Sequence, residues 1–128
     1  MRYKRNAPLR YNFGEPISSQ FKIVKIDDRE VDSQFGKAEV LNISIDGACL
    51  RTEFNIPDIN QKEVSLYFKF NINDKELNYT GNIVWKKELG KNVQYGLRIN
   101  MNEQEKQQLI DELKVYSKKG LKDYKNLA

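Results

Sequence analysis

A short polar segment in the middle of the chain carries the residue types best suited to binding chemistry. Residues 42–47, Asn-Ile-Ser-Ile-Asp-Gly, combine an amide, a hydroxyl, a carboxylate and a glycine. Such side chains often bond only to nearby backbone, and glycine supplies a positive φ at little cost, so a purely structural turn is one reading. The same groups also suit a ligand, because an amide can pair with a base edge and glycine permits close approach to the backbone.

The excess positive charge lies at the N-terminus. The chain has 22 Lys and Arg against 18 Asp and Glu, a net charge of +4. Residues 1–10 hold four basic residues and no acidic one: Arg2, Lys4, Arg5 and Arg10. Without these four, 18 basic residues face 18 acidic ones, so the rest of the chain is neutral. A local basic arm favours one anion, whereas a uniformly basic surface would indicate nucleic acid. A solvated tail is the alternative reading.

The arm and the polar turn together indicate a nucleotide. Arginine pairs bidentately with phosphate oxygens and with the O6/N7 edge of guanine. If Arg5 and Arg10 face Asn42, Ser44 and Gly47, the combination suits a guanine nucleotide that carries more than one phosphate.

Several kinds of chemistry are not supported by the composition. The chain has no histidine, which removes the usual general base and the commonest metal ligand, and no phosphate-binding glycine loop. We therefore expect no enzyme, no metal site and no cofactor.

The one cysteine, Cys49, excludes an intrachain disulfide and is expected to be a packing residue. A reducing cytoplasmic location is expected, since no apolar run has the length of a signal peptide or a membrane span.

The elements that would position these residues are mainly strands. With 128 residues the chain is expected to form a single domain. Residues 63–72 alternate cleanly between apolar and polar side chains, the pattern of a half-buried strand. Similar patterns predict six strands, over residues 17–26, 37–45, 48–54, 63–72, 76–87 and 93–99. This spacing favours an antiparallel barrel or a sandwich, with Trp85 and Tyr95 in its core.

A helix is predicted after the last strand. Asn102 followed by Glu105 resembles a capping box, which marks a helix start. The residues that share one helical stripe are Leu109, Leu113 and Tyr116. Gly120 is the expected end of this helix. We expect the helix to cover one end of the strand structure.

Three features resemble the PilZ domain family. Asn42-x-Ser44-x-x-Gly47 matches its (D/N)xSxxG motif. The arginine-bearing N-terminus, about thirty residues upstream, resembles its RxxxR segment. Residues 81–85 and 95–99, Gly-Asn-Ile-Val-Trp and Tyr-Gly-Leu-Arg-Ile, are similar to its closing strands. The resemblance covers nearly the whole chain, and the order of the three features makes it specific.

The resemblance implies a mainly β fold, a six-stranded antiparallel β-barrel with a C-terminal α-helix, that binds the bacterial second messenger cyclic di-GMP. It implies that Asn42, Ser44 and Gly47 read a guanine edge from the turn, with Asp46 as an additional contact. It assigns Arg10 to the second arginine position. The expected organisation is one domain, with a basic arm over residues 1–16 and the barrel and helix over 17–128.

The first arginine position departs from the family pattern. Asn6 stands four residues before Arg10, and Arg5 stands five before it. Arg5 is therefore expected to reach the site from one residue further away, with Arg2 or Lys4 as additional cationic contacts.

Three functions remain open on this basis. The first is a cytoplasmic receptor that folds its arginine arm over cyclic di-GMP and signals through a protein partner, since no output domain is expected in the chain. The second is a degenerate adaptor that binds a protein and no nucleotide, which the departure at Asn6 would explain. The third is a small barrel that binds single-stranded nucleic acid, against which the neutral body argues.

Overall fold

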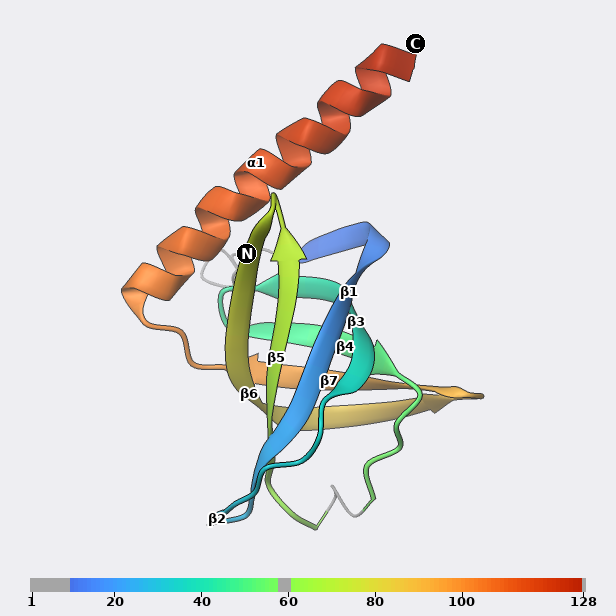
Figure 1. Cartoon of the computed structure of the whole chain (residues 1–128), viewed down its shortest axis with the longest axis vertical. Coiled ribbons are helices and arrows are strands. Elements are labelled where there is room, and N and C mark those ends of the chain that lie inside the picture. The colour runs from blue at the N-terminus through green and yellow to red at the C-terminus, as the bar shows by residue number, and fades with distance from the viewer. Residues whose placement is uncertain (1–9, 58–60, 128) are drawn as a thin grey trace, which may run out of the picture.

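The fold is a strand barrel followed by one long helix (Figure 1). The computed structural model describes residues 10–57 and 61–127, with side chains as far as Lys118. The elements are β1 Tyr11–Ile26, β2 Arg29–Glu30, β3 Gly36–Ser44, β4 Gly47–Thr52, β5 Val64–Ile72, β6 Lys75–Leu89, β7 Asn92–Ile99 and α1 Glu103–Leu127.

The six long strands close into an antiparallel barrel. Their order is β1-β3-β4-β7-β6-β5, and pairing of β1 with β5 completes the circle. The short β2 forms a hairpin with the end of β1. The sequence-based prediction of a mainly β, six-stranded antiparallel barrel with a C-terminal helix is therefore confirmed. Closure decides the choice between barrel and sandwich that the strand patterns left open.

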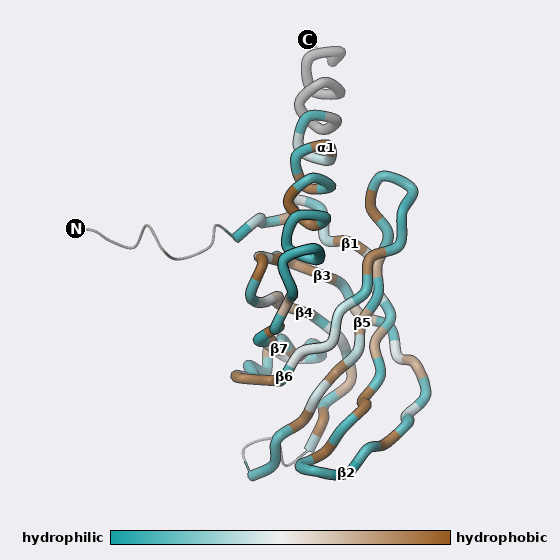
Figure 2. The backbone as a smooth tube through the Cα atoms, turned by 90° about the vertical axis from the view of Figure 1, so that its left-hand side faces the viewer, coloured by the Kyte–Doolittle hydropathy of each residue, from teal (hydrophilic) through white to brown (hydrophobic). Residues whose placement is uncertain are grey.

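Alternating side chains build the barrel core. On β5 all four residues of the predicted apolar face are buried: Val64, Leu66, Phe68 and Phe70. Figure 2 shows the same alternation of apolar and polar segments along the strands. Tyr95 of β7 has 0 % exposure, as predicted, and its hydroxyl donates to the carbonyl of Phe54 at 2.8 Å. It also accepts from the N–H of Ile56 at 2.7 Å, which fixes the loop after β4 across the barrel.

Strand β1 begins six residues before the predicted start at Ile17. Its first residues pair with β3, as Tyr11 with Ile43 and Asn12 with Asn42. The register then shifts before Ile17 pairs with Val40, leaving residues 13–16 in an irregular bulge that contains Gly14 and Pro16. These two residues interrupt the sequence pattern and also fit a bulge. The division into an arm and a barrel at residue 16 stays a prediction.

Helix α1 begins with the predicted capping box. The N–H of Glu105 donates to Asn102 Oδ1 at 2.7 Å, and the N–H of Asn102 donates to Glu105 Oε1 at 3.0 Å. The predicted end at Gly120 is wrong, because the helix continues to Leu127. A single glycine inside a helix costs only about 1 kcal/mol relative to alanine, which the flanking helix-forming residues can offset. No helix within the described ranges is long and apolar enough to cross a membrane.

The helix packs on the barrel through its predicted apolar stripe. Leu109 is fully buried, and Leu113 and Tyr116 pack against the core. The Tyr116 ring lies edge-on to Tyr11 and Phe13 of β1, with ring centroids 6.1 and 5.6 Å away. The helix thus contacts the start of β1, which lies within the predicted basic arm of residues 1–16.

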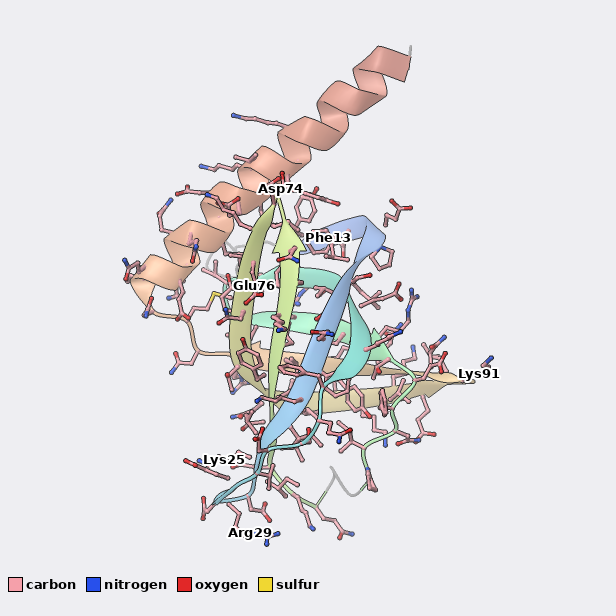
Figure 3. The ribbon with its side chains drawn as sticks, in the orientation of Figure 1. Phe13, Lys25, Arg29, Asp74, Glu76 and Lys91 are labelled. Atoms are coloured by element: carbon pink, nitrogen blue, oxygen red, sulfur yellow. The ribbon has the colours of Figure 1, made fainter. Side chains whose placement is uncertain are left out.

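A polar contact fixes the other side of the helix to the β5–β6 turn, next to Asp74 in Figure 3. The side-chain amide of Asn73 donates to the carbonyl and to Oε1 of Glu112, at 2.8 and 2.9 Å. Lys75 Nζ lies 2.9 Å from Glu112 Oε2. The hydrogen bond from Asn73, followed by that from Lys75, lowers the pKa of Glu112.

This contact predicts acid-sensitive docking of the helix. Because the pKa of Glu112 is lower in the folded chain, its stabilising effect is present above the unfolded pKa and is lost as the pH falls through the folded value. The free energy of unfolding should therefore fall more steeply in the wild type than in Glu112→Gln as the pH drops through the ordinary glutamate pKa of about 4.3 and below it. Thermal unfolding followed by circular dichroism at several pH values measures this difference. Parallel pH profiles of the two proteins would contradict the assigned role.

Candidate functional site

The polar turn is the connection between β3 and β4. Ser44 ends β3 and pairs with Gly47 at the start of β4, so only two residues form the loop. The Ser44 side chain is 2 % exposed, and its hydroxyl donates to Asp46 Oδ1 at 2.7 Å. The carbonyl of Asp46 accepts from the N–H of Ile99 at 2.9 Å, which anchors the turn to β7. Ser44 thus supports the turn from its buried side, while Asp46 is exposed.

Gly47 is required by a close approach of two strands. A Cβ at this position would lie 2.6 Å from the carbonyl oxygen of Leu97 on β7. Within the described ranges a positive φ occurs at one glycine, Gly90. The expectation that the turn glycine supplies a positive φ is therefore wrong. The absence of a side chain, which lets β4 and β7 lie close together, is what this position needs.

The register of β1 on β3 brings Arg10 to the turn. Since Tyr11 pairs with Ile43, the preceding Arg10 lies beside the end of β3. Its Nη1 donates to Asn42 Oδ1 at 2.8 Å. Its Nη2 is 3.4 Å from the position of a Cβ on Gly47. Three of the residues singled out from the sequence, Arg10, Asn42 and Gly47, are therefore neighbours, and the guanidinium remains exposed.

The other site residues predicted in the arm lie outside the described residues. This applies to Arg2, Lys4, Arg5 and Asn6. Their roles at the site stay predictions.

A pocket of about 220 Å³ opens beside the Arg10 guanidinium. It is lined by Arg10, Asn42, Ala48, Cys49, Val84, Trp85, Gly96 and Leu97. Burial raises the pKa of the Cys49 thiol, against the opposing effect of the Arg10 and Arg51 charges. The thiol is therefore neutral at pH 7, and the Arg10 guanidinium is the charged group of the pocket. No cluster of three or more potential metal ligands occurs among the described residues.

Trp85 forms one wall of this pocket, contrary to its predicted place in the barrel core. It is 45 % exposed. The β6–β7 register shifts between Ile83 and Trp85, so one extra residue, Val84, reverses the alternation beyond that point. Trp85 pairs with Gly96, where a Cβ would clash with the indole nitrogen. The ring therefore covers Gly96 and presents an aromatic surface to the pocket, an arrangement in which glycine leaves space for a neighbouring aromatic.

Sequence reasoning thus missed Trp85 as a pocket residue. A tryptophan that pairs with a glycine on an adjacent strand could have indicated an outward-facing ring. The bulge that turns the ring outward, however, cannot be recognised in the alternation of apolar and polar residues.

Two larger hollows lie on other faces of the barrel, about 500 and 560 Å³ in volume. Their linings mix lysine or arginine with glutamate. In the second, Arg51 binds Glu39 through its Nε at 3.0 Å. Unlike these two hollows, the pocket of about 220 Å³ beside the Arg10 guanidinium has an arginine and no carboxylate in its lining. It also contains the Asn42 amide and the exposed ring of Trp85. It is the better candidate for an anionic aromatic ligand.

Known proteins are similar to this chain in sequence and in fold. The family model of the PilZ domain matches residues 19–114, which is more than half of the chain. Among solved structures, the chain is similar to the PilZ domain with c-di-GMP of YcgR from Escherichia coli, at 14 % identity and a TM-score of 0.70. The match covers 95 % of this chain and 98 % of that one, and it shows a common fold. No curated protein has a significant match. The chain belongs to the PilZ domain family.

Proposed function

We propose that this protein is a receptor for cyclic di-GMP, which binds in the pocket beside Arg10. The observation that carries the proposal is the contact of Arg10 with Asn42, next to Gly47 and the exposed ring of Trp85. A guanidinium has five N–H donors, and the bond to Asn42 uses one of them. The others are available for a phosphate or for the O6/N7 edge of a guanine.

The proposed roles follow from the chemistry of each group. Arg10 binds phosphate or guanine, and Asn42 holds the guanidinium in place. Trp85 stacks on a base, since every base has a π-face and a base–aromatic stack contributes about 1–3 kcal/mol. Ser44 maintains the turn, and Asp46 offers an exposed carboxylate that can accept from a guanine N–H.

The arm completes the site in this proposal. A pocket of about 220 Å³ is smaller than the roughly 300–1,000 Å³ of typical ligand sites. Additional walls must therefore come from elsewhere, and the basic residues that precede Arg10 are the nearest in sequence. Arg5 supplies the first arginine of the family pattern, with Arg2 and Lys4 adding positive charge and Asn6 a polar contact. Ordering this arm over the ligand changes the surface of the protein.

The signal then passes to a protein partner, and helix α1 offers one path. Arg10 precedes Tyr11, whose ring packs on Tyr116 of the helix. Arg10 also borders an apolar groove of about 520 Å³ whose lining includes Ile110 and Leu113. A ligand that neutralises Arg10 would alter both the start of β1 and this groove. The proposal describes a binding protein of the bacterial cytoplasm, without catalytic activity.

Trp85 provides a direct test, because it is the one tryptophan of the chain. Titration with cyclic di-GMP should change its fluorescence in a saturable manner. Trp85→Leu should bind about fivefold more weakly or worse, as expected for loss of a base stack. Trp85→Phe, which keeps an aromatic surface, should lose less affinity. Unchanged fluorescence in a protein that binds the nucleotide by another method would exclude this pocket.

A second function, an adaptor that binds a protein and no nucleotide, is favoured by one observation. Asn6 stands where the family pattern has its first arginine. A folded protein that gives no response to cyclic di-GMP would favour this adaptor over the receptor.

A further inference from the structure

The outer half of strand β6 has a neighbour on only one side. Strand β5 pairs with β6 from Lys75 to Asn82. Strand β7 pairs with it as far as Leu89. Along residues 83–89, the side opposite β7 is therefore paired with no strand in the described part of the chain. We refer to this stretch as the β6 edge. Its hairpin with β7 projects from the barrel, with Lys91 at the tip in Figure 3.

Apolar side chains are concentrated on this edge. Six large apolar residues are exposed in the described chain, and three of them lie here: Val84 at 52 %, Trp85 at 45 % and Leu89 at 45 %. An open strand edge offers backbone N–H and C=O groups to another extended chain, and exposed apolar side chains beside it add contact area. Together they make the β6 edge suitable for an added strand.

The charges on the hairpin indicate the chemistry of that strand. Lys86 Nζ donates to the carbonyl of Ile56, in the loop after β4, at 3.0 Å. The same nitrogen lies 3.7 Å from Glu88 Oε2. Lys87 and Lys91 are exposed and form no ion pair with the described residues. The unbalanced charge beside the open edge is therefore positive. An acidic partner complements it.

The same features disfavour a second copy of this chain. Lysines and a bulge on an edge strand are common means of preventing self-association. In an antiparallel pair of two β6 edges centred at Lys87, the two copies of this lysine would face each other.

We infer that the β6 edge binds an extended, acidic segment of a partner protein, which adds a strand to the barrel beside β6. This docking does not require nucleotide. Val84 and Trp85 also line the pocket beside Arg10, so a bound ligand would alter the edge. That link, unlike the docking itself, rests on the proposed function.

The experiment uses the full chain, isotope-labelled, without nucleotide. The probe is a short capped peptide of alternating glutamate and valine, as long as the open edge, and binding is followed by backbone amide NMR shifts. We expect saturable shifts centred on residues 83–91 and their β7 partners. A peptide with lysine in place of glutamate should not bind. Two further peptides are N-methylated at alternate residues, so that each lacks the backbone donors along one of its edges. The peptide that lacks the donors facing β6 should lose binding. The peptide methylated at the other residues should bind.

Two variants separate the edge from general charge effects. Lys87→Glu should weaken binding of the acidic peptide by about fivefold, as for loss of an exposed charge pair. Lys25 is an exposed lysine far from the hairpin tip at Lys91 in Figure 3, and Lys25→Glu should leave binding unchanged. The inference would be overturned if the acidic peptide did not bind, or if its shifts lay elsewhere on the barrel. It would also be overturned if the lysine peptide bound as well as the acidic one, or if the two N-methylated peptides bound equally. Sedimentation showing a dimer that Lys87→Glu alters would assign the edge to a second copy instead.

Since the peptide titration needs no cyclic di-GMP, its failure would leave the proposed receptor function intact. Conversely, a protein that binds the peptide but not the nucleotide would retain the docking edge and lose only the link between the two sites.

Discussion

Arg10→Ala should lower the affinity for cyclic di-GMP by about 10- to 150-fold. A hydrogen bond to a charged group contributes about 1.5–3 kcal/mol, and each 1.4 kcal/mol is a factor of ten in Kd. Arg10 is exposed and its one described side-chain bond is to Asn42, so its removal should leave the barrel folded. Titration of the variant beside the wild type measures the change in Kd, and circular dichroism checks the fold.

The matched control is Arg29→Ala. Arg29 lies on β2, at the end of the barrel away from the β3–β4 turn, and is exposed. Removing it changes the net charge of the protein by the same amount as removing Arg10. Equal loss of affinity in the two variants would mean that the nucleotide responds to overall charge, which would contradict a specific site at Arg10.

Gly47→Ala should affect both stability and binding. The added Cβ would lie 2.6 Å from the Leu97 carbonyl oxygen, so β4 and β7 must move apart. Overpacking of this kind typically costs about 1–3 kcal/mol, which is a large part of the roughly 5–15 kcal/mol of a small domain. The same movement displaces Arg10, whose Nη2 is 3.4 Å from the added atom. We expect Tm to fall by several degrees and the affinity for cyclic di-GMP to fall with it.

Gly14→Ala is the control for this substitution. Nothing lies within 4 Å of a Cβ at Gly14, and its φ is not in the left-handed region. Stability should stay the same or rise slightly, since alanine restricts the unfolded chain. If both alanine variants melted alike, the close approach at Gly47 would not be the reason for its glycine.

Features set by local sequence were predictable. The alternation on β5 places Phe68 and its apolar neighbours in the core because strand side chains point to opposite faces in turn. The capping box at Asn102 is likewise a contact between residues three positions apart. Each of these depends on residues near one another in the chain, so the pattern alone contains the information.

Features set by strand registers were not predictable from a local pattern. Trp85 was placed in the core because the alternation before Val84 continues through it, and the bulge that reverses this alternation depends on the pairing with β7. The first residues of β1 were missed because Gly14 and Pro16 interrupt the pattern. They are part of β1 because Tyr11 and Asn12 pair with β3.

The candidate site shows both cases. The turn of residues 42–47 was recognisable as a motif, and Arg10 as part of a basic segment. The bond from Arg10 to Asn42 joins residues 32 positions apart, and it requires the β1–β3 register that no local pattern reveals. The chemistry of the residues suggested that Arg10 faces the turn, and the hydrogen bond makes Arg10 and Asn42 neighbours. Their roles toward a ligand stay predictions.

The most direct test of the receptor function is a calorimetric titration of the unmodified protein with cyclic di-GMP, with GMP and cyclic di-AMP as controls. The account predicts saturable binding of cyclic di-GMP in the low-micromolar range or tighter, on the order of −8 kcal/mol, with neither control matching it. No heat of binding at high nucleotide concentration, from a protein whose circular dichroism shows a folded barrel, would contradict it.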